Sequence, residues 1–343
     1  MRCRLTRLLI LTAALVSLLC TATAIVAQSA PKKSLLALSK RDHTLAIVDP
    51  ATLKVIARAP VGPDPHEVIA SSDGKTAYVS IYGGGRYHAL SVIDLVTQSV
   101  LPDIDTGALN GPHGLAFVGG KLWFTAEGAK GVARYDPATA KIDWIMGTGQ
   151  NRTHMIYVTA DEKQVYTTNV SSASVSILER VTLPPPPAGG QPRADWNQTV
   201  IPVGRGVEGF DVSPDGRELW TANAQDGTLS IIDIAGKKIT STLDAKVLGA
   251  NRLKFTPDGK LVLIASLGLG ELVIYDAASR KEFKRVNIGH GAAGILMDSD
   301  GTRAFVACSP DNYVAIVDLK TFQVSHHLDV GGVPDGLAWA VLQ

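Results

Sequence analysis

A unit of about 40 to 45 residues recurs along the chain, and this repeat limits the possible fold more than any other feature. Its clearest copy, at residues 206–238, predicts a strand at 209–212, a tight turn at 213–216, and further strands at 218–222 and 228–234. β-branched or aromatic residues alternate along each predicted strand, and Gly, Pro, Asp or Asn separate the strands. In the Ser-Pro-Asp-Gly turn, Pro214 presets φ and Gly216 supplies the positive φ that a tight hairpin requires.

Aligning the copies on the aspartate of this turn, or its equivalent, identifies one position seven residues upstream. This position is occupied, in chain order, by His66, His113, His154, Glu208, Asn251 and Ala293, and a Pro-x-Gly pattern places Asp335 there as well. Successive positions are 47, 41, 54, 43, 42 and 42 residues apart. Such a period, with four strands in each unit, is typical of a β-propeller.

The two ends of the chain complete one unit between them. Residues 35–38, 44–48 and 55–59 predict three strands, and the missing first strand is found at 333–340. We expect this C-terminal strand to close the ring, because closure removes the open sheet edge. The other units begin near Gly62, Ala108, Gln150, Arg205, Val247 and His290. The sequence therefore predicts an all-β fold: a single seven-bladed β-propeller over residues 35–343, with four-stranded antiparallel blades.

Residues 1–24 have a different character. Arg2, Arg4 and Arg7 precede an apolar run at 8–20, and small residues favour cleavage after Ala24. This pattern is typical of a secretory signal peptide, and the run is shorter than a membrane span. We therefore expect a soluble periplasmic or secreted protein with no transmembrane segment after signal cleavage. Residues 25–34 would form a linker to the propeller.

Cysteine content and charge argue against two further features, namely disulfide bonds within the chain and a strong affinity for nucleic acid. Two of the three cysteines precede the expected cleavage site, so only Cys308 remains and no intramolecular disulfide can form. Without the three N-terminal arginines the chain has two more acidic than basic side chains, which gives no strong nucleic-acid signal. Seven closed blades need no second subunit for stability, so we expect a monomer.

The unit at 150–204 is longer than the others because of an insertion at 183–195, which contains four consecutive prolines. Proline cannot donate to a strand ladder and favours an extended polyproline II conformation. We expect a loop that protrudes between the third and fourth strands of this blade. Both a plain insertion and a docking site for a protein partner fit this pattern.

The segments AYVS at 77–80, SPDGRELWTAN at 213–223 and VAIVDLKTFQV at 314–324 resemble the YVTN-type β-propeller repeat of exported bacterial and archaeal proteins. The resemblance covers nearly all of 35–340 and is specific for the fold. For function it implies only a range, from proteins of unassigned role and surface-layer proteins to lactonase-like proteins and parts of redox enzymes. In some of those enzymes histidines hold a copper cluster, but with many more histidines than this ring offers.

The first strand of a propeller blade lines the central channel, and its entry loop shares a face with the loop between the second and third strands. We expect that face to gather the seven aligned positions together with Tyr82, Glu127, Asn169, Asn223 and Ser309. A small polar ligand or a protein partner would bind there. The residues we expect to contact it are Arg152, Arg252, Asn251, Asn223, Asp335 and Tyr82.

Three histidines in one register, His66, His113 and His154, are followed by Glu208 on the next blade. Imidazoles with a carboxylate suit one divalent transition metal, namely zinc, copper or manganese. Glu208 would then act as a fourth ligand or a base, and Glu127 as a general base or a partner of a ring histidine. The alternative is a water-filled polar funnel that holds no metal.

Two functions therefore stay open, and the sequence does not decide whether the protein is an enzyme. The first, which we favour, is an exported scaffold that binds a ligand or partner through its channel face. The second is a metal-dependent lactonase-like hydrolase or lyase, in which Arg152 or Arg252 would orient an anionic substrate. The sequence has no Gly-x-Ser-x-Gly, Cys-x-x-Cys or haem-attachment motif, which removes support from esterase, thioredoxin-like and c-type cytochrome functions.

Overall fold

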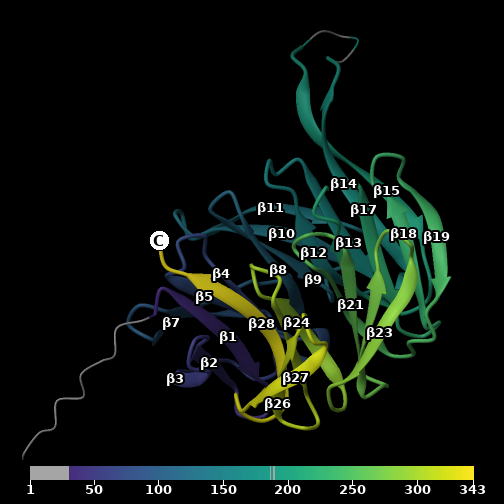
Figure 1. The fold of residues 1–343 in the computed structure, drawn as a ribbon. Helices are drawn as coiled ribbons and strands as arrows, with labels where there is room; N and C mark the ends of the chain where they lie inside the picture. Colours follow the sequence, from purple (N-terminus) through teal and green to yellow (C-terminus); the bar gives the residue numbers. More distant parts are fainter. Residues whose placement is uncertain (1–30, 186, 188–189) are drawn as a thin grey trace, which may run out of the picture.

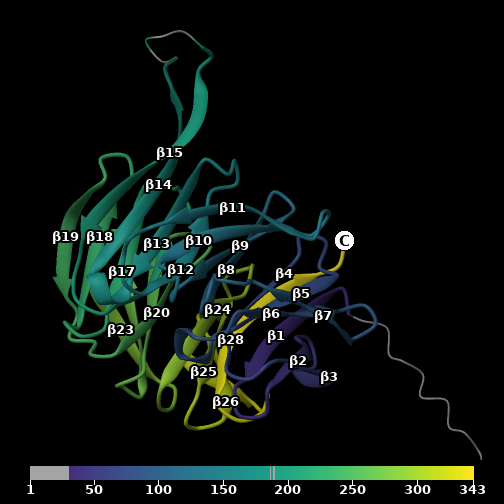
Figure 2. The ribbon, with the colours of Figure 1, turned by 180° about the vertical axis from the view of Figure 1, so that it is seen from behind.

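The computed structural model describes residues 31–185, 187 and 190–343, so the expected signal peptide and most of the expected linker lie outside the described residues. The described strands form seven four-stranded antiparallel sheets around a central axis, which confirms the predicted propeller (Figure 1, Figure 2). The described helical elements are two short 3-10 turns, η1 (Gly83–Gly85) and η2 (Val170–Ser172). No helix among the described residues has the length and apolar character needed to cross a membrane.

The blades follow one another in chain order. The first consists of β28 (Pro334–Val341), β1 (Lys33–Ser39), β2 (Thr44–Asp49) and β3 (Lys54–Pro60). The second and third contain β4 (Pro65–Ala70), β5 (Thr76–Ile81), β6 (Ala89–Asp94) and β7 (Ser99–Asp105), then β8 (Pro112–Val118), β9 (Lys121–Ala126), β10 (Gly131–Asp136) and β11 (Lys141–Gly147). The fourth and fifth contain β12 (Thr153–Val158), β13 (Gln164–Asn169), β14 (Ser174–Leu183) and β15 (Arg193–Pro202), then β16 (Val207–Val212), β17 (Glu218–Asn223), β18 (Thr228–Asp233) and β19 (Lys238–Asp244). The sixth and seventh contain β20 (Ala250–Phe255), β21 (Leu261–Ser266), β22 (Glu271–Asp276) and β23 (Lys281–Asn287), then β24 (Ala292–Met297), β25 (Arg303–Cys308), β26 (Tyr313–Asp318) and β27 (Gln323–Leu328).

The hydrophobic interior lies between neighbouring blades. The middle strands β17 and β18 are buried over nearly their whole length, because a neighbouring blade covers each of their faces. The outermost strand β11 instead alternates between half-buried and exposed residues. Trp220 on β17 is fully buried and packs edge-on against Phe255 of the next blade, with ring centroids 5.8 Å apart. Contacts of this kind fix each blade against the next.

The Ser-Pro-Asp-Gly turn forms as the sequence predicts. Gly216 has a φ of 72° and donates its N–H to the carbonyl oxygen of Ser213 at 2.8 Å, and the Ser213 hydroxyl donates to Asp215 Oδ1 at 2.6 Å. The same hydroxyl-to-aspartate bond joins Ser71 to Asp73, Thr159 to Asp161, and Thr256 to Asp258. These turns lie at the same end of their blades, which we call the turn face.

The ring closes as predicted. β28 pairs with β1 in an antiparallel register that places Leu35 opposite Trp339 and Ala37 opposite Leu337. In Figure 1 the two strands lie side by side, one from each end of the colour scale. Trp339 also packs edge-on against Phe305 of the seventh blade, with centroids 5.3 Å apart, so closure fixes the neighbouring blade as well.

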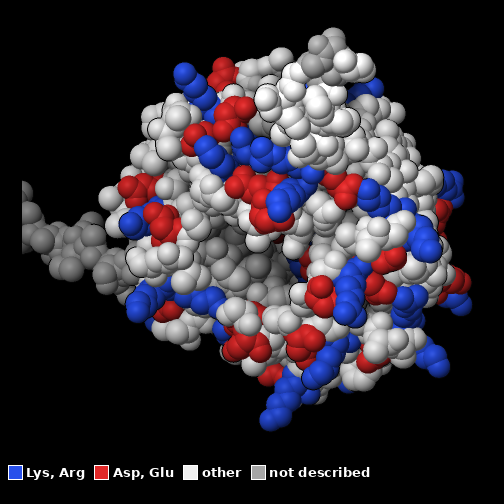
Figure 3. All heavy atoms as spheres, turned by 90° about the horizontal axis from the view of Figure 1, so that it is seen from above, with Lys and Arg blue, Asp and Glu red and all other residues white. Residues whose placement is uncertain are grey.

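β14 and β15 are ten residues long and project from the turn face as a hairpin (Figure 1). They pair continuously from Ser174 opposite Pro202 to Leu183 opposite Arg193. The ends of the expected 183–195 insertion therefore belong to the strand ladder, and the connection covers 184–192, within which 186, 188 and 189 are not described. Seen from the side of this hairpin, basic and acidic side chains intermingle around a central hollow (Figure 3).

Candidate functional site

The seven aligned positions are structurally equivalent, because each is the second residue of the first strand of its blade. They are His66 on β4, His113 on β8, His154 on β12, Glu208 on β16, Asn251 on β20, Ala293 on β24 and Asp335 on β28. All seven line one cavity of about 300 Å³ at the end of the channel opposite the turn face. We call this cavity and its lining residues the channel-mouth site. Lys40, Tyr82, Arg152 and Arg252 also line it.

The chain enters each first strand through a residue with positive φ, two positions before the ring residue. In four blades this residue is glycine: Gly111, Gly206, Gly249 and Gly291. The other three blades have Asp64, Arg152 and Val333, with φ values of 56°, 54° and 54°. The left-handed conformation costs a non-glycine residue about 1–2 kcal/mol, and such residues concentrate at functional sites. Arg152 and Val333 line the cavity, which places two of these three departures at the site.

His154 is held between two carboxylates. Its Nδ1 bonds to Glu127, and its Nε2 lies 2.8 Å from Glu208 Oε2. Burial by itself lowers the pKa of His154, but the hydrogen bonds to both carboxylates outweigh burial and raise the pKa. Burial by itself raises the pKa of Glu208, because it disfavours the charged carboxylate, but His154 and two nearby arginines lower that pKa to about 2. Both carboxylates beside His154 are therefore ionised at neutral pH.

His113 stacks on His154, with ring centroids 3.9 Å apart and planes inclined by 34°. His113 is 1% exposed, and its Nδ1 has no hydrogen-bond partner among the described residues. Burial, and then the charge of His154, hold the pKa of His113 well below its usual range. The pKa values of the two stacked rings are thus shifted in opposite directions, downward for His113 and upward for His154.

Glu127 directly follows β9 and is buried beneath the cavity. Its Oε2 accepts a hydrogen bond from the Tyr82 hydroxyl, and its Oε1 bonds to His154. Burial by itself raises the pKa of Glu127, but the bond with His154 and the other contacts lower it. Burial, and then the bond to Glu127, raise the pKa of Tyr82. Glu127 is therefore an ionised carboxylate held in place at both oxygens.

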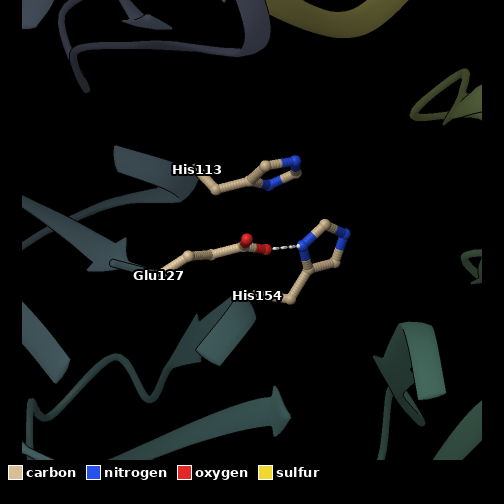
Figure 4. Close-up of side chains that lie close together, drawn as sticks. All are labelled: His113, Glu127 and His154. Atoms are coloured by element: carbon tan, nitrogen blue, oxygen red, sulfur yellow. Dashed lines mark hydrogen bonds and ion pairs between the residues drawn. The ribbon is translucent and has the colours of Figure 1, made fainter. Parts of the chain in front are cut away.

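One ligand atom from each of His113, Glu127 and His154 lies within 4.8 Å of the other two. Figure 4 shows the three side chains converging, with the ring of His113 over the contact between Glu127 and His154. Two imidazoles and a carboxylate are a donor set that proteins use for divalent metals.

His66, the third histidine predicted to bind metal, is not part of this group. Its Nε2 lies 2.6 Å from Lys40 Nζ and 3.1 Å from Asp64 Oδ1, and its Nδ1 lies 3.6 Å from Asp335 Oδ2. An ammonium group at Nε2 competes with a metal for that nitrogen. The structure therefore does not place His66 in one ligand set with His113 and His154, although the rings of His66 and His113 are neighbours at 4.9 Å.

Arg252 follows the ring position on β20, where four blades have glycine: Gly114, Gly209, Gly294 and Gly336. A Cβ at Gly114 would lie 2.5 Å from the carbonyl oxygen of His154, which explains the glycine. The other three blades have Glu67, Met155 and Arg252. Glu67 and Arg252 form an ion pair between the second and sixth blades. Burial by itself lowers the pKa of Arg252, but Glu67 and other carboxylates raise it. Because the Arg252 guanidinium is paired with Glu67, fewer of its N–H groups can bind a substrate.

Arg152 is the most exposed of the three cations that line the cavity, with 42% of its side chain accessible against 22% for Lys40 and 9% for Arg252. Its Nε lies 3.5 Å from Glu127 Oε2, and its Nη1 lies 3.8 Å from Glu208 Oε1. Both separations exceed a normal hydrogen bond, so the N–H groups remain able to bind a ligand.

The structure does not bring Asn223 to the cavity. Asn223 is the last residue of β17, whereas Tyr82 and Glu127 directly follow the equivalent strands. A shift of one residue turns a side chain to the other side of a strand. The amide of Asn223 is accordingly used inside its own blade, where it donates to Thr228 Oγ1 at 3.0 Å and Ser230 Oγ at 2.9 Å.

Sequence reasoning missed Lys40 and Glu67. Lys40 directly follows β1, in the position that Tyr82 has after β5, so extending the alignment into the first blade would have found it. No local signal identifies Glu67, because its partner is 185 residues away.

Two other features carry no comparable chemistry. A larger cavity of about 560 Å³ lies on the turn face, lined in part by Thr256, Asp258 and Asp300, but these carboxylates bond within their own turns. Cys308 is buried on β25, and burial raises the pKa of its thiol to about 12. We therefore place the candidate site at the channel mouth.

No family model matches the chain, and no curated protein matches it either. Solved structures do match. A protein of unknown function from Desulfotomaculum acetoxidans has a TM-score of 0.72 at 11% identity, covering 90% of this chain and 98% of that one. The hydrazine synthase of Kuenenia stuttgartiensis gives 0.69 at 18% identity, covering 83% and 92%. A Bacteroides uniformis protein provisionally named a 6-phosphogluconolactonase gives 0.71 at 14% identity, covering 90% and 100%. At such identities the likeness shows the seven-bladed propeller fold alone.

Proposed function

We propose that the protein is an exported binding scaffold that holds a small polar ligand with a carboxylate or phosphate group at the channel-mouth site. Arg152 carries this proposal. Its guanidinium is part of the cavity lining, and the nearest carboxylate oxygens are 3.5 and 3.8 Å away. A planar guanidinium whose contacts with carboxylates are this long suits bidentate binding of a ligand carboxylate or phosphate.

The size and lining of the cavity support a small ligand. A volume of about 300 Å³ lies at the lower end of the range for ligand pockets. Asn251 donates from Nδ2 to the carbonyl oxygen of Ala293 at 2.7 Å, and its Oδ1 is an acceptor suited to a ligand hydroxyl. The ion pairs of Lys40 and Arg252 hold the surrounding walls in place, so the cavity is preformed.

The test is a binding screen of sugar phosphates and aldonic acids against the mature chain, followed by calorimetry. The screen includes 6-phosphogluconolactone, because two solved structures with this fold carry the corresponding provisional name. Arg152→Ala is expected to weaken binding about 10- to 100-fold, as the loss of charge-assisted hydrogen bonds implies. Arg217→Ala, on the turn face, is the matched control and should bind like the wild type. Equal affinity in the wild type and Arg152→Ala would contradict the proposal.

A second candidate is a metal-dependent lactonase-like hydrolase or lyase, favoured by the convergence of His113, Glu127 and His154. A divalent metal at such a site supplies Lewis-acid polarisation of a carbonyl oxygen. The assay compares lactone hydrolysis by zinc-supplemented and chelator-treated protein. Hydrolysis that requires metal, and that His113→Ala abolishes, would favour this candidate over the scaffold.

The proposed location and state of assembly rest on the N-terminal segment and on the closed ring. We expect the exported protein to begin at residue 25, and mass spectrometry of the secreted or periplasmic form reads this directly. Light scattering of that form should give the mass of one chain.

A further inference from the structure

We propose that His113, Glu127 and His154 bind one zinc-type divalent cation, and that Glu208 and Tyr82 position these ligands without binding the metal themselves. The inference rests on the second candidate function and deepens it by naming a ligand set. It does not depend on the anionic ligand proposed above.

The first observation is an unused nitrogen. His113 is 1% exposed, and its Nδ1 is buried with no hydrogen-bond partner among the described residues. Buried polar atoms are nearly always paired, so an orphaned imidazole nitrogen beside two other donor groups calls for a ligand. One ligand atom from each of the three residues already lies within 4.8 Å of the other two.

The second observation is the direct contact between His154 Nδ1 and Glu127 Oε1. Without a metal, these two atoms form a hydrogen bond with each other. A divalent cation that replaces the proton would use the same two atoms, because metal binding to imidazole displaces a proton. Arg252 is offset by its partner Glu67. With both histidines neutral, the two carboxylates Glu127 and Glu208 then exceed the positive charge of Arg152 by one negative charge, which a divalent cation offsets.

The third observation is the support behind each ligand. Glu208 lies 2.8 Å from Nε2 of His154, which leaves Nδ1 for the metal and is the carboxylate–histidine arrangement common behind metal sites. The Tyr82 hydroxyl donates to Oε2 of Glu127, which leaves Oε1 for the metal. The atoms not needed for coordination are thus already bonded.

The ligand types favour zinc. Two imidazoles and one carboxylate occur as a three-ligand set in catalytic zinc sites, where a fourth position is kept for water or substrate. The set contains no sulfur donor, and the one cysteine among the described residues, Cys308, is buried in the seventh blade. His113 and His154 both line the cavity, which gives the site access from solvent.

The experiment uses the mature chain, treated with chelator and titrated with Zn²⁺ and Co²⁺. We expect one metal per chain by elemental analysis, and a visible absorption band when cobalt is bound. His113→Ala should lose uptake. Glu208→Gln should weaken affinity about 10- to 100-fold, as for other groups that orient a metal ligand.

His66→Ala is the matched control, because it removes a ring histidine of the same register that contacts Lys40 instead of the cluster. It should keep full metal uptake. If His66→Ala and His113→Ala lose metal equally, the ligand set is wrong although a metal site exists. If the treated wild type takes up neither ion, there is no metal site. If metal binds as expected but no lactone is hydrolysed, only the hydrolase function fails.

X-ray absorption of the zinc-loaded wild type needs no variant and so remains decisive if His113→Ala does not fold. The expected shell contains nitrogen and oxygen atoms at about 2.0–2.2 Å with two imidazoles. A sulfur shell at about 2.3 Å, or a shell without imidazole, would overturn the assignment.

Discussion

The two ends of the propeller are made from the same repeat, but they use it differently. On the turn face, serine or threonine donates to the aspartate two residues later in blade after blade, at 2.6 to 2.7 Å. At the channel mouth, the seven equivalent ring positions carry five different residue types. The turn face thus repeats one hydrogen-bonded turn, whereas the channel mouth has different side chains at equivalent positions of the blades.

The glycines around the ring extend this contrast. Four blades have glycine two positions before the ring residue, and four have it one position after, where backbone geometry or close packing requires it. The departures include Arg152, Glu67 and Arg252, and each contributes a charge at or beside the cavity. Repetition in this chain therefore marks what the fold requires, and these three charged departures lie at or beside the candidate site.

The largest effect is expected at the ion pair between Glu67 and Arg252. Arg252→Ala would leave the Glu67 carboxylate, which is 14% exposed, without its partner, so we expect the free energy of unfolding to fall by about 3 kcal/mol. The double variant with Glu67→Ala should recover part of this loss. Urea denaturation measures both. If the free energy of unfolding of Arg252→Ala is close to that of the wild type, the ion pair with Glu67 does not stabilise the propeller.

A smaller, pH-dependent effect is expected for Glu208→Gln, which removes one carboxylate from His154. The charge-assisted bond is worth about 2 kcal/mol. Because the pKa of Glu208 is lowered from 4.5 to about 2, its contribution is complete above pH 4.5 and is lost as the pH falls toward 2. Because the pKa of His154 is raised from 6.5, the contribution of protonated His154 to the free energy of unfolding is complete below pH 6.5. This contribution is lost as the pH rises through the raised pKa.

The difference in unfolding free energy between wild type and Glu208→Gln should therefore be greatest between pH 4.5 and 6.5. Chemical denaturation across a pH series measures it. A difference that does not vary with pH would contradict an ionic contact between Glu208 and His154 in the folded protein.

The smallest effect is expected on the turn face. Gly216 and Gly259 have φ values of 72° and 71°, and a Cβ at Gly216 would meet nothing within 4 Å. Substitution by alanine should therefore cost only the left-handed conformation, about 1 kcal/mol at each position. The two variants should be equally destabilised in urea and should retain wild-type metal uptake. If the two variants differ in destabilisation, the turns are not equivalent copies. If either variant changes metal uptake, the turn face is not independent of the channel-mouth site.

The sequence was sufficient for the fold because the turn residues recur at a fixed period, and period and turn chemistry together determine strand order. It also located the ring, since all seven aligned positions line the cavity. It failed at Asn223, where an error of one residue in a loop reversed the direction of the side chain. It could not anticipate that Lys40 lies beside His66 or that Arg252 pairs with Glu67, because those contacts depend on how side chains from different blades meet at the channel mouth.

Closure of the ring by β28 and β1 also sets an order of events during synthesis. Leu36 pairs with Ala338, so one of the earliest strands made must wait for the last one before its blade is complete. Until then β1 has an unpaired edge, to which a strand from another chain could add. For a chain that crosses a membrane unfolded, this last pairing can occur only after translocation has finished. If this chain is exported as proposed above, the interval in which β1 has an unpaired edge falls in the compartment where the protein is delivered, rather than in the one where it is made.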